Sequence, residues 1–256
     1  MDNSDTSPVK AEDIWVALGL LTRLPLPGRD WNSTRPAAMA AWAYPLAGLV
    51  VAVLACLIAT LLVRLGLPTD MIAAALLLCM SVFTGAMHED GLADSADGLW
   101  GGATPERRLE IMKDSHSGAY GVITLIATFA LRWAGLSALL AQGWLWLPVL
   151  VAATTSRAAM AFVMNALPNA RVSGLSSLTG RPGKAAPRIA ASLGAAMAVL
   201  GFGLAGLWVL LATVAATALC ATIARAKIGG QTGDILGATQ QVTEIAALGA
   251  ICAHVL

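Results

Sequence analysis

The chain has 256 residues, of which 57% are apolar and only 12% are charged. Soluble domains carry about 45–50% apolar and roughly 25% charged residues, so this composition excludes a disordered, collagen-like or ordinary cytosolic protein. The 16 Lys and Arg residues nearly balance the 15 Asp and Glu residues, which excludes a nucleic-acid-binding protein that works through excess basic charge. An integral membrane protein remains. Its long runs of Ala, Leu and Val lack the alternation of a transmembrane barrel, so we expect an all-α fold.

Seven apolar segments approach or exceed the roughly 20 residues that a helix needs to cross a bilayer. They cover residues 37–63, 71–87, 120–141, 144–166, 188–203, 206–224 and 242–256. Residues 11–21 are too short to cross and precede two prolines, which predicts an N-terminal interfacial or re-entrant helix. We therefore predict a polytopic helical membrane protein with about seven transmembrane helices in one domain, residues 1–256. The first ten residues lack the basic start of a secretory signal, so we expect no cleaved targeting peptide.

The basic residues are concentrated in alternate loops. Four precede the first span, three follow the second, four follow the fourth and two follow the sixth, whereas the other loops hold only Arg64. By the positive-inside rule, loops 88–118, 167–187 and 225–241 are expected to be cytoplasmic, with the N-terminus inside and the C-terminus outside. These loops also carry nearly all the acidic residues, so any chemistry is expected at the cytoplasmic face.

Four acidic residues lie within nine positions directly after the second predicted span, in the segment MHEDGLADSADG. If the second helix continues beyond the membrane, Asp90, Asp94 and Asp97 share one face of it, within about 60° around the axis. Carboxylates this close repel one another and require a counter-charge. Oxygen ligands suit Mg²⁺ better than Zn²⁺, so we expect a magnesium site formed by these three residues with Glu89. Alternatively, Glu89 and His88 support the ligands or form an acid/base pair.

Basic residues follow the acidic cluster along the chain. Arg107, Arg108 and Lys113 are expected to neutralise the phosphates of a polyanionic substrate. They lead into the segment KDSHSGAYG, where glycine lets the backbone approach a ligand closely. Further candidates for substrate binding in this segment are Asp114, Ser115 and Gly118.

Three charged residues fall inside or at the edge of predicted spans, where a charge is costly and indicates a function or an internal ion pair. Arg157 is expected to pair with Glu244 or with an Asp of the acidic cluster, or to contact substrate. Arg132 either faces the interior or extends its side chain to the membrane surface. In the segment GGQTGDILGA, Thr232 or Asp234 is a possible helix cap, and Asp234 is alternatively a substrate contact.

The segments HEDGLADSADGLWGG and ERRLEIMKDSHSGAYG closely resemble the cobalamin synthase family, the adenosylcobinamide-GDP ribazoletransferases. TRLPLPG and GGQTGDILGA match other segments of that family, so the resemblance covers residues 11–245. It implies a Mg²⁺-dependent enzyme of the bacterial or archaeal inner membrane, with a cytoplasmic active face. Such an enzyme joins adenosylcobinamide-GDP to alpha-ribazole or its 5'-phosphate and releases GMP. The resemblance is compatible with a homo-oligomer or with contact with other corrinoid-pathway enzymes.

The resemblance also implies roles for the candidate residues. The acidic cluster would hold metal on the diphosphate, and the ribose 3'-hydroxyl of alpha-ribazole would attack the phosphorus on the cobinamide arm. The basic residues would offset the charge of the departing GMP. A general base could come from His88, His116 or a carboxylate such as Asp94 or Asp97, and the sequence does not choose among them.

Two other classes of protein share part of this pattern. CDP-alcohol phosphotransferases also place an Asp-rich motif on a membrane helix, and the segment from Asp94 to Gly98 matches its first half, but the second half is missing. A cation transporter would need paired carboxylates at mid-span and internal repeats. The acidic residues here instead cluster beyond the end of a predicted span.

Overall fold

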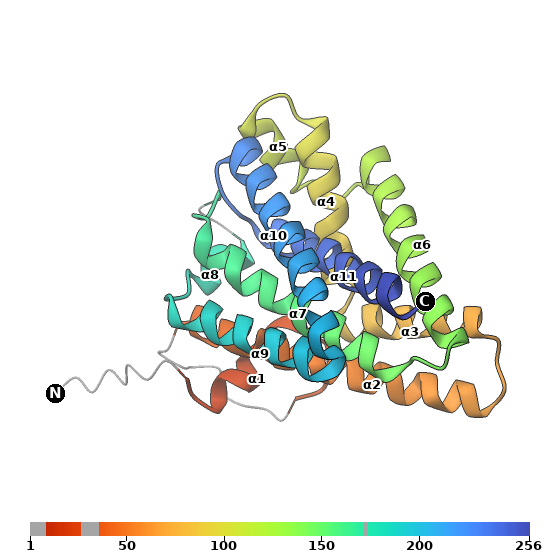
Figure 1. Ribbon diagram of the computed structural model, residues 1–256. Helices are drawn as coiled ribbons and strands as arrows, with labels where there is room; N and C mark the ends of the chain where they lie inside the picture. Colours follow the sequence, from red (N-terminus) through yellow and green to blue (C-terminus); the bar gives the residue numbers. More distant parts are fainter. Residues whose placement is uncertain (1–8, 27–35, 172–173) are drawn as a thin grey trace.

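The computed structural model describes residues 9–26, 36–171 and 174–256. Within these ranges the chain forms helices and no β-strand, apart from one isolated bridge between Asn169 and Gln231, which confirms the all-α prediction. The elements are, in chain order (Figure 1), α1 (Glu12–Leu21), η1 (Ala37–Ala43), α2 (Tyr44–Arg64), α3 (Thr69–Thr84), α4 (Met87–Gly101), α5 (Pro105–Ile111), α6 (Ala119–Ala141), α7 (Trp146–Ala166), α8 (Leu175–Thr179), α9 (Ala185–Phe202), η2 (Gly203–Ala205), α10 (Gly206–Ile228) and α11 (Gly233–Val255).

The expectation about a targeting peptide concerns mainly residues 1–8, which lie outside the described residues. Arg29 and Arg35, two of the four basic residues counted before the first span, also lie outside them. The helix expected at residues 11–21 is present as α1.

Five helical stretches in the described part of the chain are long and apolar enough to cross a membrane. They are Ala37–Arg64, Ala119–Ala141, Trp146–Ala166, Ala185–Ile228 and Gly233–Val255. The bent pair α3 and α4 adds a sixth if the two helices together form one span. The structure therefore confirms a polytopic helical protein but not the expected count of seven, because the fifth and sixth predicted spans belong to a single stretch of 44 residues.

The second predicted helix does not continue into the acidic segment. α3 ends at Thr84 and α4 begins at Met87, with an angle of 89° between the two helices. Gly85 (φ 66°) and Ala86 (φ 56°) both adopt the left-handed backbone conformation. Glycine in this conformation commonly ends a helix, whereas the same conformation costs roughly 1–2 kcal/mol at alanine. The predicted continuation is thus wrong. The helical spacing of the acidic residues survives nonetheless, because α4 contains all of them.

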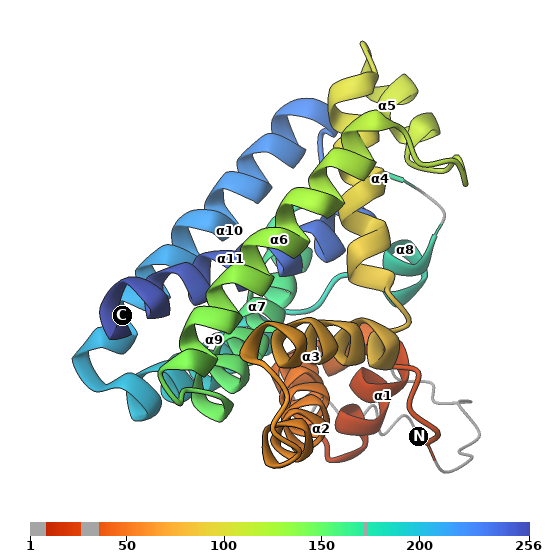
Figure 2. The same cartoon turned by 90° about the vertical axis from the view of Figure 1, so that its right-hand side faces the viewer.

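Helices α7 and α11 form the centre of the molecule. α7 packs against α2, α9 and α11, and α11 also packs against α4, α6 and α10. In Figure 1, α11 lies between α10 and α6, and Figure 2 shows α10 and α6 along the two flanks of the same region. α11 therefore connects the helix that carries the acidic cluster to the rest of the fold.

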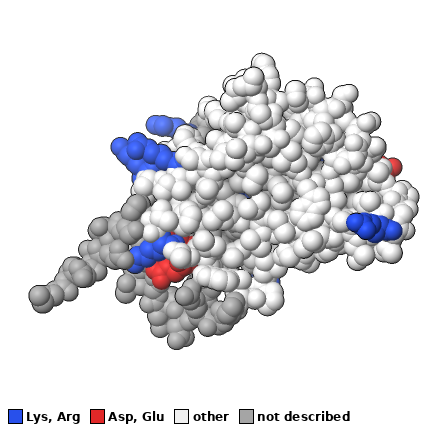
Figure 3. All heavy atoms as spheres, turned by 60° about the horizontal axis from the view of Figure 1, so that its bottom comes forward, with Lys and Arg blue, Asp and Glu red and all other residues white. Residues whose placement is uncertain are grey.

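The outer surface is largely apolar. Seen from below the view of Figure 1, the molecule shows a broad surface of uncharged atoms, with the charged side chains at its edges (Figure 3). Large apolar side chains such as Leu57, Leu61 and Leu200 are exposed. Exposure on this scale is typical of a surface that contacts lipid rather than water.

Two glycines allow α4 and α11 to cross at close range. A Cβ atom on Gly91 would lie 2.9 Å from the carbonyl oxygen of Asp234, and one on Gly237 would lie 3.2 Å from the Cα atom of His88. Because neither glycine has a side chain, the two backbones come into contact. This contact brings the acidic residues of α4 next to the start of α11.

Replacing Gly91 with Ala is expected to force α4 away from α11. An overpacked site of this kind costs about 1–3 kcal/mol, so the variant should unfold at a lower temperature than the wild type in detergent, as followed by Trp fluorescence. Gly249→Ala is the matched control, because a Cβ atom on this glycine of α11 would meet no atom within 4 Å. Equal melting temperatures for the two variants would contradict the close-approach interpretation.

Candidate active site

A polar cleft of about 190 Å³ lies where α4, α11 and the segment around α8 meet. Asp90 from α4 and Asp234 from the first turn of α11 both line it. The segment from residue 168 is held in place by backbone hydrogen bonds, from the Ala170 N–H to the Gln231 carbonyl and from the Gln231 N–H to the Pro168 carbonyl, each 2.8 Å. The cleft is therefore built from three parts of the chain that are far apart in sequence.

Arg171 and Asp234 form an ion pair in the cleft. An Nη atom of Arg171 lies 2.8 Å from Oδ2 of Asp234, which also accepts a hydrogen bond of 3.2 Å from the Thr232 hydroxyl. The Thr232 hydroxyl also accepts a hydrogen bond from the Ile235 N–H and so caps α11. Thr232 rather than Asp234 therefore caps α11, and the Asp234 carboxylate is left to pair with Arg171.

Negative charge exceeds positive charge at this place. Asp94, one turn beyond Asp90, is half-buried, and the charged groups that act on its carboxylate are Asp90, Asp234, Arg171 and Asp97. Neither Asp90 nor Asp94 forms an ion pair within the described residues. In the described part of the chain, the carboxylates here outnumber the one guanidinium, that of Arg171, which acts on Asp94. This arrangement suits a divalent cation bound together with substrate phosphate.

The other two residues of the expected metal site are engaged elsewhere. Asp97 accepts hydrogen bonds from the N–H groups of Gly118 (2.7 Å) and Gly121 (2.9 Å) at the start of α6. Glu89 accepts hydrogen bonds from Ser81 (2.9 Å) and Gln241 (3.1 Å). In the part of the chain that the structure describes, no three His, Cys, Asp or Glu side chains are arranged to hold a metal ion. The four predicted ligands therefore do not form one cluster, and only Asp90 and Asp94 lie beside Asp234.

The basic residues expected at the site lie on and after α5. Arg107 is exposed and pairs with Glu110 at 3.0 Å. Arg108 donates a hydrogen bond of 2.8 Å to the Lys227 carbonyl, which fixes α5 to the end of α10. Lys113 is exposed. None of these residues lines the polar cleft.

The segment after α5 forms a surface turn. Asp114, Ser115, His116 and Gly118 are all exposed, and Nδ1 of His116 lies 2.6 Å from the Asp114 carboxylate. Hydrogen bonds from the ring and the backbone of His116 hold the pKa of the Asp114 carboxyl below its usual value. His88, the other candidate base, is buried, and its Nε2 has no hydrogen-bond partner among the described residues. Neither histidine lines the polar cleft.

A buried network of charges lies on the inner side of α4. The two carboxylate oxygens of Glu244 bind Arg132 at 2.8 Å and Arg157 at 2.7 Å, and all three side chains are at most 3% exposed. Arg132 also donates a hydrogen bond to Gln241 and lies 3.5 Å from the Glu89 carboxylate. The pairing of Arg157 with Glu244 was one of the predicted alternatives and is confirmed. Arg132 faces the interior and does not extend to the membrane surface.

The loop after α7 supplies part of the cleft, and its sequence is compatible with an ordered anion-binding loop, but none of its residues was predicted as a site residue. Asn169, Arg171 and Ser176 line the cleft together with Gln231, and the Ser176 hydroxyl donates a hydrogen bond of 2.7 Å to the Gln231 side chain. The Gly, Ser and basic content of this loop was the available signal, but it is equally typical of a flexible linker. Only the fold shows that the loop lies against Asp234.

Comparison with known proteins gives one consistent result. The cobalamin-5-phosphate synthase family matches residues 13–252 of the chain. A protein of Bradyrhizobium diazoefficiens named adenosylcobinamide-GDP ribazoletransferase is 43% identical over 246 residues, which cover 92% of this chain and 91% of that protein. Proteins with the same name from Sinorhizobium sp and Brucella ovis are each 40% identical, over 94% and 91% of this chain and 95% and 93% of their own. No solved structure matches the chain.

Replacing Asp97 with Ala is expected to destabilise the start of α6. The variant leaves the N–H groups of Gly118 and Gly121 without their acceptor, and losing such a cap costs about 0.5–2 kcal/mol. Asp90→Ala is the control, because Asp90 is exposed and its loss should leave the melting temperature unchanged. An Asp97→Ala variant as stable as Asp90→Ala would show that Asp97 does not serve as a cap.

Replacing Glu244 with Gln is expected to destabilise the protein strongly. It leaves Arg132 and Arg157 buried without their shared counter-charge, and breaking a buried ion pair costs about 3–5 kcal/mol. Adding Arg157→Gln to this variant should restore part of the melting temperature, because it removes one uncompensated charge. Glu110→Gln, at an exposed ion pair, is the control and should melt like the wild type. A Glu244→Gln variant that also melts like the wild type would refute the structural role of the network.

Proposed function

Because the chain belongs to the cobalamin-5-phosphate synthase family, we propose that it is an adenosylcobinamide-GDP ribazoletransferase. It transfers the cobinamide phosphoryl group of adenosylcobinamide-GDP to alpha-ribazole or its 5'-phosphate and releases GMP. The observation that carries this proposal is the cleft lined by Asp90, Asp234 and Arg171, with the Asp94 carboxylate close enough to interact with their charges. Binding and cleaving a diphosphate requires positive charge next to the phosphate oxygens, from a metal ion held by carboxylates or from a guanidinium.

The carboxylates of the cleft fit a magnesium ion. Mg²⁺ is usually bound by one or two carboxylates together with substrate phosphates, so a dedicated cage of protein ligands is not needed. Asp90 and Asp94 would hold the ion together with the substrate phosphates, and the ion would neutralise the phosphate oxygens and polarise the phosphorus. This assignment leaves out Glu89 and Asp97, because both of those carboxylates accept hydrogen bonds elsewhere, and it leaves Asp234 paired with Arg171.

The reaction needs few protein groups besides those of the cleft. The hydroxyl oxygen of alpha-ribazole forms a bond to the phosphorus on the cobinamide arm, and the bond from that phosphorus to the oxygen of GMP breaks. The hydroxyl proton passes to a carboxylate of the cleft, since His88 is buried and His116 lies outside the cleft. Arg171 is placed to offset the charge of the GMP phosphate as it leaves.

We further propose that the cleft opens on the cytoplasmic side of the bacterial inner membrane. Half of the 16 Lys and Arg residues lie in the loops 88–118, 167–187 and 225–241, which favours the cytoplasmic side for these loops under the positive-inside rule. Both substrates carry polar or charged groups that a cytoplasmic opening would admit directly.

The test is GMP release by the purified protein in liposomes with adenosylcobinamide-GDP, alpha-ribazole and Mg²⁺, followed by chromatography. Asp94→Asn and Asp234→Asn should each reduce the rate by about 100-fold or more, because the first removes a carboxylate that would hold the metal ion and the second removes the partner that positions Arg171. Removal of Mg²⁺ with EDTA should stop the reaction, and added Mg²⁺ should restore it.

Asp70→Asn is the control for these variants, because Asp70 is exposed at the start of α3, far along the chain from the cleft residues. It should retain the wild-type rate. Absence of GMP release by the wild type would overturn the proposed function. Full activity of Asp94→Asn and Asp234→Asn would leave the family activity intact but refute the cleft as its site.

A further inference from the structure

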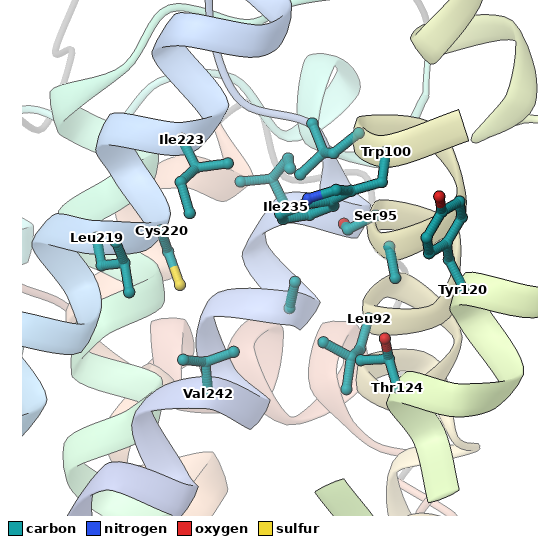
Figure 4. A pocket seen from close by; sticks show the side chains of 13 residues that line it. Leu92, Ser95, Trp100, Tyr120, Thr124, Leu219, Cys220, Ile223, Ile235 and Val242 are labelled. Carbon is teal, nitrogen blue, oxygen red and sulfur yellow. The ribbon is translucent and has the colours of Figure 1, made fainter. Parts of the chain in front are cut away.

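A second cavity, of about 400 Å³, lies between α6 and α10 (Figure 4). Side chains of α4 and α11 form its floor, and its lining is almost entirely apolar, with Leu92, Leu99 and Ile235 among the contributors. Its volume lies within the range of about 300–1,000 Å³ that is typical of ligand-binding pockets. An apolar cavity of this size stays dry and accepts apolar ligands.

The cavity is separate from the polar cleft. At 100° per residue, Leu92 and Leu99 lie about 160–180° around α4 from Asp90, so the cavity and the carboxylates occupy opposite faces of this helix. A substrate held in the cavity would therefore lie behind α4, away from the residues that act on phosphate. The occupant must be a different molecule.

The opening of the cavity lies between two helices that are long and apolar enough to span a membrane. Three of its lining side chains, Trp100, Tyr120 and Leu219, are each more than half exposed. Hydrocarbon chains of the bilayer surround such helices, so an acyl chain can enter the cavity from the side. A neighbouring helix is about 10–12 Å across and would not fit.

A cation lies at one end of the cavity. Lys227 follows Ile223 by one turn on α10, and its Nζ lies 5.4 Å from the centre of the Trp100 ring. Arg225 is exposed in the same helical turn. Near Trp100, the buried Ser95 hydroxyl lines the cavity and has no hydrogen-bond partner within the described residues (Figure 4).

We propose that this cavity binds one acyl chain of an anionic phospholipid, with the phosphate of the headgroup at Lys227. The apolar lining accommodates the chain, and the Ser95 hydroxyl is available to donate to an ester carbonyl near the headgroup. The positive charge of Lys227 selects an anionic headgroup over a zwitterionic one, because one Lys near an anionic surface contributes about 1 kcal/mol. This site is independent of the transfer reaction.

Native mass spectrometry of the purified protein tests the proposal, with phosphatidylglycerol and phosphatidylcholine of identical chains added in equal amounts. The wild type should retain one phosphatidylglycerol about fivefold more often than one phosphatidylcholine. Thr124→Trp fills the cavity from α6 and should lose the bound lipid. Thr222→Trp, at an exposed position on α10 that does not line the cavity, is the matched control and should retain it.

The Lys227→Gln variant gives a second test that leaves the packing of the cavity lining unchanged. This variant should retain phosphatidylglycerol and phosphatidylcholine equally. Four results would overturn the proposal. They are equal retention of phosphatidylglycerol by the two Trp variants, no headgroup preference in the wild type, displacement of the lipid by inorganic phosphate, and a dimer that only Thr124→Trp abolishes. If Thr124→Trp does not fold, an unchanged preference in Lys227→Gln overturns it.

Discussion

The fold depends on the carboxylate of Glu244, which is buried between Arg132 and Arg157. Each of these charges would be very costly alone in the interior of a membrane protein, so the three side chains must stay together. They come from α11, α6 and α7, and these three helices are therefore held in one relative position. Hydrophobic packing between helices in lipid lacks this directionality, because lipid chains are as apolar as the side chains.

The same network reaches the candidate active site. Glu89 contacts Arg132 and Gln241 and is the immediate neighbour of Asp90, so the first turn of α4 is attached to the charged core. The close approach at Gly91 then sets the distance between α4 and Asp234. The carboxylates Asp90 and Asp94 are thus placed by the contacts of Glu89 and Gly91 in the same helix and not by one another, since their mutual repulsion favours separation.

The sequence allowed the local parts of this arrangement to be predicted. The spacing of Asp90 and Asp94 correctly placed them on one helical face, and the cost of isolated charges in a membrane predicted a partner for Arg157, with Glu244 as one of the alternatives. Two contacts could not be predicted, that of Asp97 with Gly118 and that of Arg171 with Asp234. Each joins two separate segments of the chain, whereas residue spacing describes positions within one helix, and a carboxylate accepts a hydrogen bond from any nearby donor. The break at Gly85 was missed because glycine is also common inside membrane helices.

α4 explains why an enzyme that acts on phosphates is built into a membrane. One face of this helix carries carboxylates that must contact water, metal or substrate, and the opposite face lines an almost entirely apolar cavity. In a soluble protein the apolar face would need a further layer of helices, and at the centre of a bilayer the carboxylates would be too costly. The boundary between membrane and water accommodates both faces at once.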